Sequence, residues 1–321
     1  MNIIKTTLLL SVIIFPLLSF TQDSTKINID KKKKYLYWLN LYGYVKTLTE
    51  RSYSATSYQD KIQKGKLTSK AIYNFNTLGN ILDKQKFDGD TIHPEIESIK
   101  RDNKGHIFEW NTYYKDGSLH ETSTFKYDDA GYKIESTWDI LDHHQKVPRL
   151  PQYTFKETND ERGNNIIHEV WIPDFKEDKL TLVNKWTYKY DKKNNKIEET
   201  YIFDSIVEDK KIYKYDSLGN QIEIDSYQGS GELTNKEITE YDINGNVVKI
   251  SKFYSDGSLI SRSEYDGKGN EIADLRFDSK GFVSYKITRK YEYDDKGNWT
   301  VSYIYVNDII QRINVRDFIY Y

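Results

Sequence analysis

The chain contains no cysteine, one methionine and five prolines among its 321 residues. Because cysteine is absent, disulfide bonds cannot stabilise the fold and a lipid-modified cysteine cannot anchor the chain. The scarcity of proline and of flexible methionine is typical of an ordered β-protein with a stiff core. Stability must therefore come from a hydrophobic core and from a hydrogen-bonded ladder of strands.

An excess of charge of either sign is also missing. The 47 lysines and arginines are balanced by 49 aspartates and glutamates, which gives a formal net charge of −2. Proteins that bind nucleic acid need a basic surplus to displace counterions, so we expect no nucleic-acid partner. Charged residues make up 30% of the chain, yet it also holds 28 tyrosines and 13 phenylalanines. Disordered chains are charged but poor in aromatic residues, so this composition predicts a folded protein.

The apolar run at the N-terminus is too short to span a membrane as a helix. Leu8–Leu18 has 11 residues and follows Lys5, whereas a bilayer-spanning helix needs about 20. Small residues follow at Ser19 and Thr21, the two positions that a signal peptidase inspects. We therefore predict a signal peptide cleaved between Thr21 and Gln22, and no transmembrane helix in the mature chain.

These features divide the chain into three parts. We expect a signal peptide at 1–21, an N-terminal leader at 22–40 and a single repeat domain at 41–321. A basic run in the leader, Lys31–Lys34, is interpreted as a solvated segment. The protein is expected to be secreted, or to reside in the periplasm or cell envelope.

A short motif recurs through the chain at regular spacing. It reads Tyr-Asp-x-x-Gly-Asn, and its clearest copies begin at Tyr215, Tyr241, Tyr265 and Tyr293. Weaker copies lie at 75–80, 127–131 and 190–195. The step from Gly219 to Gly245 is 26 residues, and the next glycines follow at steps of 12, at Gly257, Gly269 and Gly281. Such internal repetition indicates a repeat architecture.

The residue types in the motif are those of a tight hairpin turn. Aspartate at the first position of a type I turn accepts backbone N–H groups, and the residue three positions later needs positive φ, which glycine adopts without steric cost. Asn194 occupies the glycine position of one copy, and asparagine tolerates this conformation better than other non-glycine residues. We therefore predict that Gly245 ends a hairpin turn at positive φ.

The segments between the turns alternate as β-strands do. In 283–293, one face would carry Val283, Tyr285, Ile287, Tyr291 and Tyr293, and the other Ser284, Lys286, Thr288, Lys290 and Glu292. This period of two predicts strands with one buried face. The predicted fold is all-β, with tandem antiparallel hairpin repeats forming a twisted, rolled sheet or partial β-shell of roughly 16 to 22 strands. The pattern leaves open whether the sheet closes.

The copies of Tyr-Asp-x-x-Gly-Asn together resemble the YD repeat of Rhs proteins and teneurins. The stretch from Gly43-Tyr44-Val45-Lys46 to Lys66 also resembles short secreted YD-repeat proteins of the Bacteroidetes. The resemblance covers roughly residues 40 to 321 and implies a sheet wound into a spiral shell. Full Rhs proteins enclose a C-terminal toxin, but here the repeats continue to Tyr321, so we expect no toxin domain.

The repeat rhythm fails in the middle of the chain. Gly131 to Gly163 spans 32 residues and Gly163 to Asn194 spans 31, against the usual 24 to 26. We expect the extra residues in loops at 139–152 and 173–179, either as tolerated insertions or as binding loops. The candidate ligand-binding residues in or beside these loops are Trp138, His143, His144 and Trp171.

The sequence carries no pattern that predicts catalysis or a cofactor. Asp142, His143 and His144 form the most metal-like group, but no third histidine or cysteine with ligand spacing accompanies them, so a polar loop is favoured. The segment from Asp242 resembles the start of a calcium loop, but Phe253 occupies the position of the essential carboxylate. Nucleophile elbow, phosphate loop and dinucleotide fingerprint are all missing. We therefore expect no enzyme activity, no metal and no cofactor.

Three functions remain open. The first hypothesis is a structural or interaction scaffold with an envelope protein as partner, since repeat surfaces usually serve contacts. The second is glycan binding, since six tryptophans and many tyrosines could stack on sugars, although cross-strand pairing also explains the tyrosines. The third is an outer-membrane β-barrel. The alternating Ile313, Val315, Ile319 and Tyr321 fit such a barrel, whereas lysines and glutamates opposite aromatic residues elsewhere do not.

Overall fold

The computed structural model describes residues 39, 41–59, 61–88, 91–114, 116–141, 153–174 and 179–321. The predicted signal peptide and all of the leader except Leu39 lie outside these residues, as do Asp142, His143 and His144. All regular structure in the described part of the chain is β-strand. No helix there is long and apolar enough to cross a membrane.

Twenty antiparallel strands make up the described part of the fold. The first ten are β1 (Val45–Tyr58), β2 (Lys61–Phe75), β3 (Ile81–Asp88), β4 (Thr91–Arg101), β5 (Ile107–Tyr113), β6 (Leu119–Tyr127), β7 (Lys133–Ile140), β8 (Tyr153–Asn159), β9 (Asn165–Asp174) and β10 (Lys179–Tyr190). The second ten are β11 (Lys196–Phe203), β12 (Ile206–Tyr215), β13 (Gln221–Gln228), β14 (Leu233–Tyr241), β15 (Val247–Tyr254), β16 (Leu259–Tyr265), β17 (Glu271–Phe277), β18 (Val283–Tyr293), β19 (Trp299–Val306) and β20 (Ile309–Tyr320).

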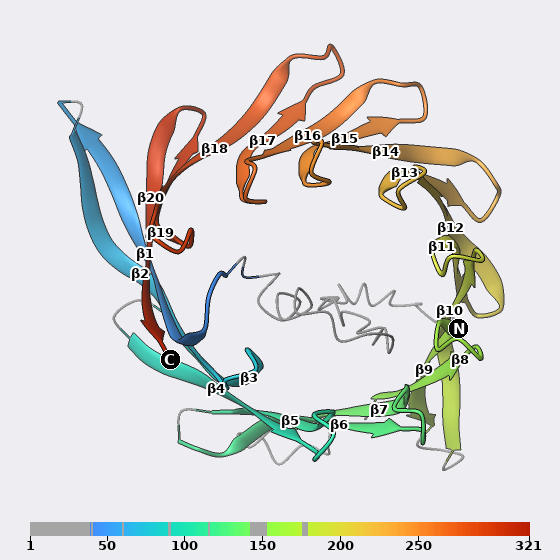
Figure 1. The fold of residues 1–321 in the computed structure, drawn as a ribbon. Helices are drawn as coiled ribbons and strands as arrows, with labels where there is room; N and C mark the ends of the chain where they lie inside the picture. The colour runs from blue at the N-terminus through green and yellow to red at the C-terminus, as the bar shows by residue number, and fades with distance from the viewer. Residues whose placement is uncertain are drawn as a thin grey trace, which may run out of the picture.

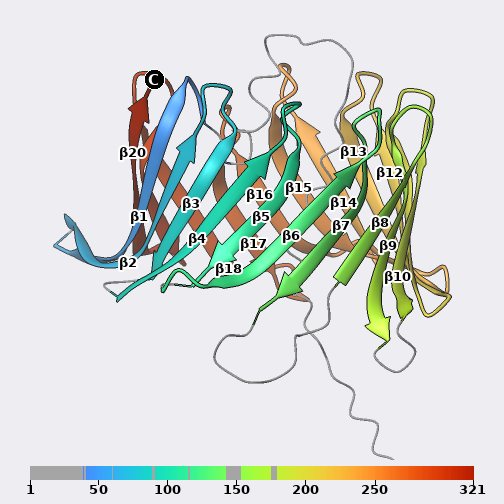
Figure 2. The same cartoon turned by 90° about the horizontal axis from the view of Figure 1, so that it is seen from below.

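Each strand pairs with the strands before and after it in the chain, and the two ends of the series pair with each other. β1 pairs with β2 on one side and with β20 on the other, where Leu48 lies opposite Phe318 and Arg51 opposite Val315. The sheet is therefore a closed barrel of 20 strands, seen along its axis in Figure 1 and from the side in Figure 2.

The closed ring corrects the predicted partial shell, while the predicted all-β hairpin repeats are confirmed. A partial shell would leave one edge of β1 and one edge of β20 without partners, and unpaired edges invite association with other chains. Pairing these two strands satisfies both rows of backbone groups. The contact joins residues far apart in sequence, such as the ion pair between Arg51 and Asp317, which are 266 positions apart.

The connections lie on two rims because strand direction alternates around the ring. One rim, which we call the motif rim, holds nine turns, from 76–80 between β2 and β3 to 294–298 between β18 and β19. Eight of these turns begin with aspartate and one with Asn76. The other rim, which we call the hairpin rim, holds the remaining hairpin tips, including those at 278–282 and 307–308.

The motif turns have the predicted geometry. Gly245 adopts a φ of +81°, and Asn194, in the glycine position of its own turn, adopts +66°. Asp242 Oδ1 accepts backbone N–H bonds from Asn244 at 2.9 Å and from Asn246 at 2.8 Å. The Asn246 side chain also donates to Asp242 Oδ2 at 2.9 Å. This last bond explains the asparagine that ends the motif.

In four copies of the motif, the tyrosine joins its repeat to the one before it. These four tyrosines donate their hydroxyl to the carbonyl of the first residue in the strand that precedes their own. The pairs are Tyr127 with Ile107 at 2.8 Å, Tyr190 with Asn165 at 2.9 Å, Tyr215 with Lys196 at 2.7 Å and Tyr241 with Gln221 at 2.7 Å. Each such bond contributes about 0.5–1.5 kcal/mol to stability.

The sheet has an inner and an outer face. Residues 41–44 lie inside the ring (Figure 1), and Leu39 and Leu41 pack against Leu48 and Tyr73. The face that carries Leu48 is therefore the inner one. The outer face carries lysines and glutamates that form ion pairs across adjacent strands, such as Lys126–Glu135 at 2.6 Å and Lys189–Glu198 at 2.7 Å.

A buried cluster lies at the seam where β20 meets β1. Asn298 is fully buried, accepts the Tyr42 N–H at 2.5 Å and donates to the Tyr42 carbonyl and the Tyr320 hydroxyl, both at 2.8 Å. Arg316 donates to the Leu39 carbonyl at 3.0 Å and lies over the ring of Trp299, 3.7 Å from its centroid. Leu39, at the end of the predicted leader, therefore packs with the barrel.

Candidate functional site

The two described tryptophans among the predicted ligand-binding residues lie in strands, on opposite faces of the sheet. Trp138 is in β7 and its ring stacks on Tyr153 at 5.5 Å between centroids. Trp171 is in β9, where its Nε1 donates to Glu169 at 3.3 Å and Lys156 Nζ lies 4.6 Å from its ring centroid. Following the paired residues around the ring from Leu48 places Trp138 on the inner face, and Trp171 on the outer one.

Both predicted loops fall largely outside the described residues. At 173–179, Pro173 and Asp174 end β9 and Lys179 begins β10, with Pro173 opposite Leu180, while residues 175–178 are not among the described ones. The other predicted loop lies between Ile140 and Tyr153, and its residues 142–152, including His143 and His144, are outside the described residues.

The inner face instead brings together an aromatic row that the sequence analysis missed. Phe155, His168, Trp186 and Tyr201 come from the four consecutive strands β8 to β11. Their ring centroids are 5.9 Å apart between Phe155 and His168, 5.3 Å between His168 and Trp186, and 4.8 Å between Trp186 and Tyr201. Because the rings stand side by side across the strands, they present mainly their edges to the interior of the barrel.

A register rule could have found this row. Because the register shifts by one residue next to each motif turn, a residue n positions before the centre of the turn lies opposite the residue n + 1 positions after it, as Trp186 and Tyr201 do about the turn at 191–195. The same rule pairs Glu157 with His168 about the turn at 160–164. The turns are recognisable in the sequence, so counting outward from them is the signal that would have predicted these pairs.

Two carboxylates, the buried Glu157 and the half-buried Glu199, lie beside the aromatic row. Glu157 Oε1 is 2.9 Å from His168 Nδ1 and 3.0 Å from Lys133 Nζ, and Glu157 also accepts a bond from the Asn165 side chain. Burial by itself raises the pKa of Glu157. The His168 hydrogen bond and the Lys133 charge outweigh that effect, so the pKa lies below its ordinary value.

Glu199 repeats this arrangement one hairpin further on. Its Oε2 accepts bonds from Lys196 Nζ at 2.6 Å and from the Tyr213 hydroxyl at 3.0 Å. Burial raises the pKa of Glu199. The hydrogen bond from Lys196 and the positive charge of Lys196 lower it by more, so the pKa of Glu199 lies below its ordinary value. Burial and the nearby Glu199 carboxylate both raise the pKa values of Tyr188 and Tyr213, so these phenols stay neutral. We call this group, with the aromatic row, the inner-wall site.

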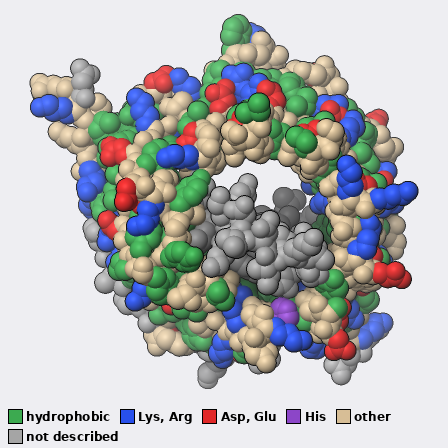
Figure 3. Space-filling model, in the orientation of Figure 1, with side chains coloured by type: hydrophobic (Ala, Val, Ile, Leu, Met, Phe, Trp, Pro, Cys, Tyr) green, Lys and Arg blue, Asp and Glu red, His purple; other side chains and the backbone are tan. Residues whose placement is uncertain are grey.

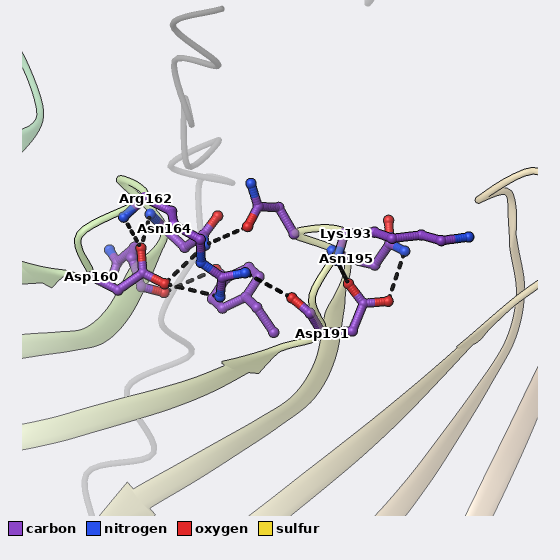
Figure 4. A network of polar contacts seen from close by, with 9 residues as sticks. Asp160, Arg162, Asn164, Asp191, Lys193 and Asn195 are labelled. Atoms are coloured by element: carbon purple, nitrogen blue, oxygen red, sulfur yellow. Dashed lines mark hydrogen bonds and ion pairs between the residues drawn. The ribbon is translucent and has the colours of Figure 1, made fainter.

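The motif rim next to the inner-wall site is held together by bonds between two turns (Figure 4). Arg162 Nη1 donates to the Asp191 carbonyl at 3.0 Å, and the Asn164 side chain donates to Asn194 Oδ1 at 3.2 Å. Bonds from the Asn195 backbone and side chain hold the pKa of Asp191 below its ordinary value. These contacts fix the relative position of the β8–β9 and β10–β11 hairpins, which carry the aromatic row.

The carboxyl groups of the inner-wall site are held in their ionised form, as acceptors of hydrogen bonds. Among the described residues, every carboxyl group with a resolved shift has a lowered pKa, Glu157 and Glu199 included. The same part of the chain contains no group of three or more residues that could hold a metal ion.

Comparisons with known proteins find similarity only among solved structures. No protein-family model matches the chain, and no curated protein matches it. The crystal structure of TcdB2-TccC3-TEV is similar at 14% identity and a TM-score of 0.34, and the match covers 81% of this chain but 15% of that one. A porin-like protein from Bacteroides uniformis is similar at 9% identity and a TM-score of 0.34, with 86% of this chain and 96% of that chain covered.

Proposed function

We propose that this chain is an exported, non-enzymatic binding protein of the YD-repeat type, which holds its ligand against the inner-wall site. The observation that carries the proposal is the row of four rings flanked by two carboxylates, each bonded to a lysine. Pre-positioned polar groups beside aromatic edges are the usual composition of a binding surface. An interaction scaffold, with the closed barrel as its rigid support, is the first form of this function.

Glycan binding is the second form, and the inner-wall site favours it specifically. Sugars offer apolar C–H faces and hydroxyl groups, which match aromatic side chains and charged hydrogen-bonding groups respectively. The site supplies carboxylate acceptors at Glu157 and Glu199 and donors at Lys196 and Tyr213.

A membrane-spanning role is not favoured by the outer wall. Lysine–glutamate pairs recur there, including Lys100–Glu109 at 2.7 Å and Lys214 with Glu223. A charged side chain on a lipid-facing strand costs about 2–4 kcal/mol at the bilayer midplane for lysine. We infer that the barrel wall is in water.

A matched pair of tryptophan variants tests the proposal. The exported chain should bind on a glycan array, and Trp186→Leu should weaken that binding about threefold to tenfold, as expected for a contact worth about 0.5–1.5 kcal/mol. Trp171→Leu, on the outer face, should leave binding unchanged. If Trp171→Leu abolished binding and Trp186→Leu did not, the inner-wall site would be the wrong site. If the array stayed blank, glycan would be the wrong ligand class, and the same variants would be compared in pull-downs from the native envelope.

The export part of the proposal has its own test. Sequencing of the N-terminus of the protein recovered outside the cytoplasm should return Gln22, because the apolar run and the small residues before it predict cleavage there. A sequence that begins at Met1 would contradict the proposed signal peptide.

A further inference from the structure

The β1–β2 hairpin extends beyond its neighbours as a free arm. β20 pairs with β1 only as far as Ser54, and β3 pairs with β2 only from Ser69 onward. Between these points β1 and β2 pair only with each other. All described residues from Thr56 to Lys66 are exposed, and Figures 1 and 3 show the arm projecting from the ring.

A bulge at the base of the arm lets it leave the barrel wall. The register between β1 and β2 shifts between Tyr53 and Ala55. Gly65 lies in the shifted stretch, and a Cβ at this position would lie 3.1 Å from the Ser54 carbonyl oxygen. A glycine in a strand often marks such a bulge or a close backbone approach. At the base of the arm, Ala55 packs on Ile310 and Ile313 of β20.

The tip of the arm and the tips of the two preceding hairpins expose large apolar side chains. These hairpins, β17–β18 and β19–β20, adjoin the arm on the hairpin rim. Tyr58, Ile62, Phe282, Val283 and Ile309 have between 40% and 69% of their surface exposed. They lie on three hairpin tips that follow one another around the hairpin rim, and we call this set of side chains the three-tip patch.

Several cations around the three-tip patch have no carboxylate partner in the described part of the chain. Many wall lysines are paired with carboxylates, as Lys249 is with Glu240 at 2.7 Å, and others, such as Lys290, lie over aromatic rings. By contrast, Lys61, Lys66, Lys280 and Arg312 form no ion pair among the described residues, and Lys64 lies over the ring of Tyr53, 4.5 Å from its centroid. Of the nearby acids, Asp308 is paired with Lys286, and Asp278 accepts backbone N–H bonds in its own turn.

We propose that the three-tip patch docks this protein onto an anionic lipid surface. Exposed aromatic and aliphatic side chains flanked by unpaired lysines are the pattern of interfacial membrane contact, in which rings enter the headgroup layer and lysines attract anionic headgroups. Three separate tips on one rim suit a flat partner better than a peptide, which would need a groove. The barrel lies on the membrane through its hairpin rim and does not cross it.

Vesicle co-sedimentation with the full exported chain tests this docking. The chain should sediment with phosphatidylcholine vesicles that contain phosphatidylglycerol and not with phosphatidylcholine alone, and salt should weaken the binding. Lys61→Gln and Lys66→Gln should lower the partition coefficient about fivefold each. Phe282→Ser with Ile309→Ser should lower it further, with the melting temperature of each variant as a check on folding.

A matched control comes from the opposite rim. Leu218 and Ile243 lie at turn tips of the motif rim and are even more exposed, at 85% and 101%. Because they face away from the proposed membrane contact, Leu218→Ser with Ile243→Ser should leave vesicle binding unchanged. Equal loss from this control would overturn the proposal. Failure of the unaltered chain to bind anionic vesicles would also overturn it, and binding to soluble polyglutamate without vesicle binding would identify an acidic protein as the partner instead. These outcomes are independent of Trp186 and of the inner-wall site.

Discussion

At the scale of single residues, the motif specifies the backbone conformation of a turn. The glycine position requires a left-handed backbone, and at Gly245 a Cβ would meet no atom within 4 Å. The cost of a larger residue there should therefore come from the backbone alone and not from a clash. Gly267 provides the comparison, because a Cβ there also meets nothing within 4 Å and its φ is not in the left-handed region.

We predict that Gly245→Val lowers the free energy of unfolding by about 1–3 kcal/mol, the usual cost of a non-glycine residue held at positive φ. Gly245→Asn should cost much less, because Asn194 already occupies the equivalent position. Gly267→Val should change stability little. Urea denaturation of the three variants measures these differences, and equal stabilities for all three would show that the turn does not depend on this conformation.

At the scale of strands, the inner-wall site also ties elements together. Glu157 in β8 is bonded to His168 in β9 and to Lys133 in β7. The pKa of Glu157 in the folded protein lies below its ordinary value of 4.5. A group with a depressed folded pKa contributes stability above its unfolded pKa and loses that contribution as pH falls through the folded value.

We therefore predict a pH-dependent difference between the natural chain and Glu157→Gln. The natural chain should be more stable at neutral pH, and the difference should narrow as pH falls below about 4.5. Glu240→Gln, which removes a half-exposed partner of Lys249, should show little difference at any pH because exposed pairs contribute little. Thermal melts of the natural chain and both variants across the acid range measure these stability differences. A difference for Glu157→Gln that did not depend on pH would mean that the ionised carboxylate is not what joins the three strands.

At the scale of the whole molecule, the seam between β20 and β1 closes the ring. Asn298 and Asn246 occupy the same motif position, but Asn298 also bonds to both backbone groups of Tyr42 and to the Tyr320 hydroxyl. We expect Asn298→Ala to lower the free energy of unfolding by at least about 1 kcal/mol more than Asn246→Ala. Denaturation of both variants tests this, and a smaller loss for Asn298→Ala would indicate that the ring does not rely on this contact.

The sequence by itself determined the local structure of this protein. Asp242 and Gly245 specify a turn because the bonds and dihedral angles concerned lie within five residues. Once a turn is placed, its two strands can pair in only one register that buries the intended face. The strands, the turns and the all-β class follow from such short-range terms.

Only the tertiary structure decided closure and the site. Whether β1 reaches β20 depends on twist and stagger summed over 20 strands, which no single repeat encodes. Within a hairpin, counting from the turn pairs Glu157 with His168 and Trp186 with Tyr201. The two pairs meet in one row only because β9 pairs with β10 across a register shift between Leu182 and Asn184, which places His168 opposite Trp186 and which no turn motif specifies.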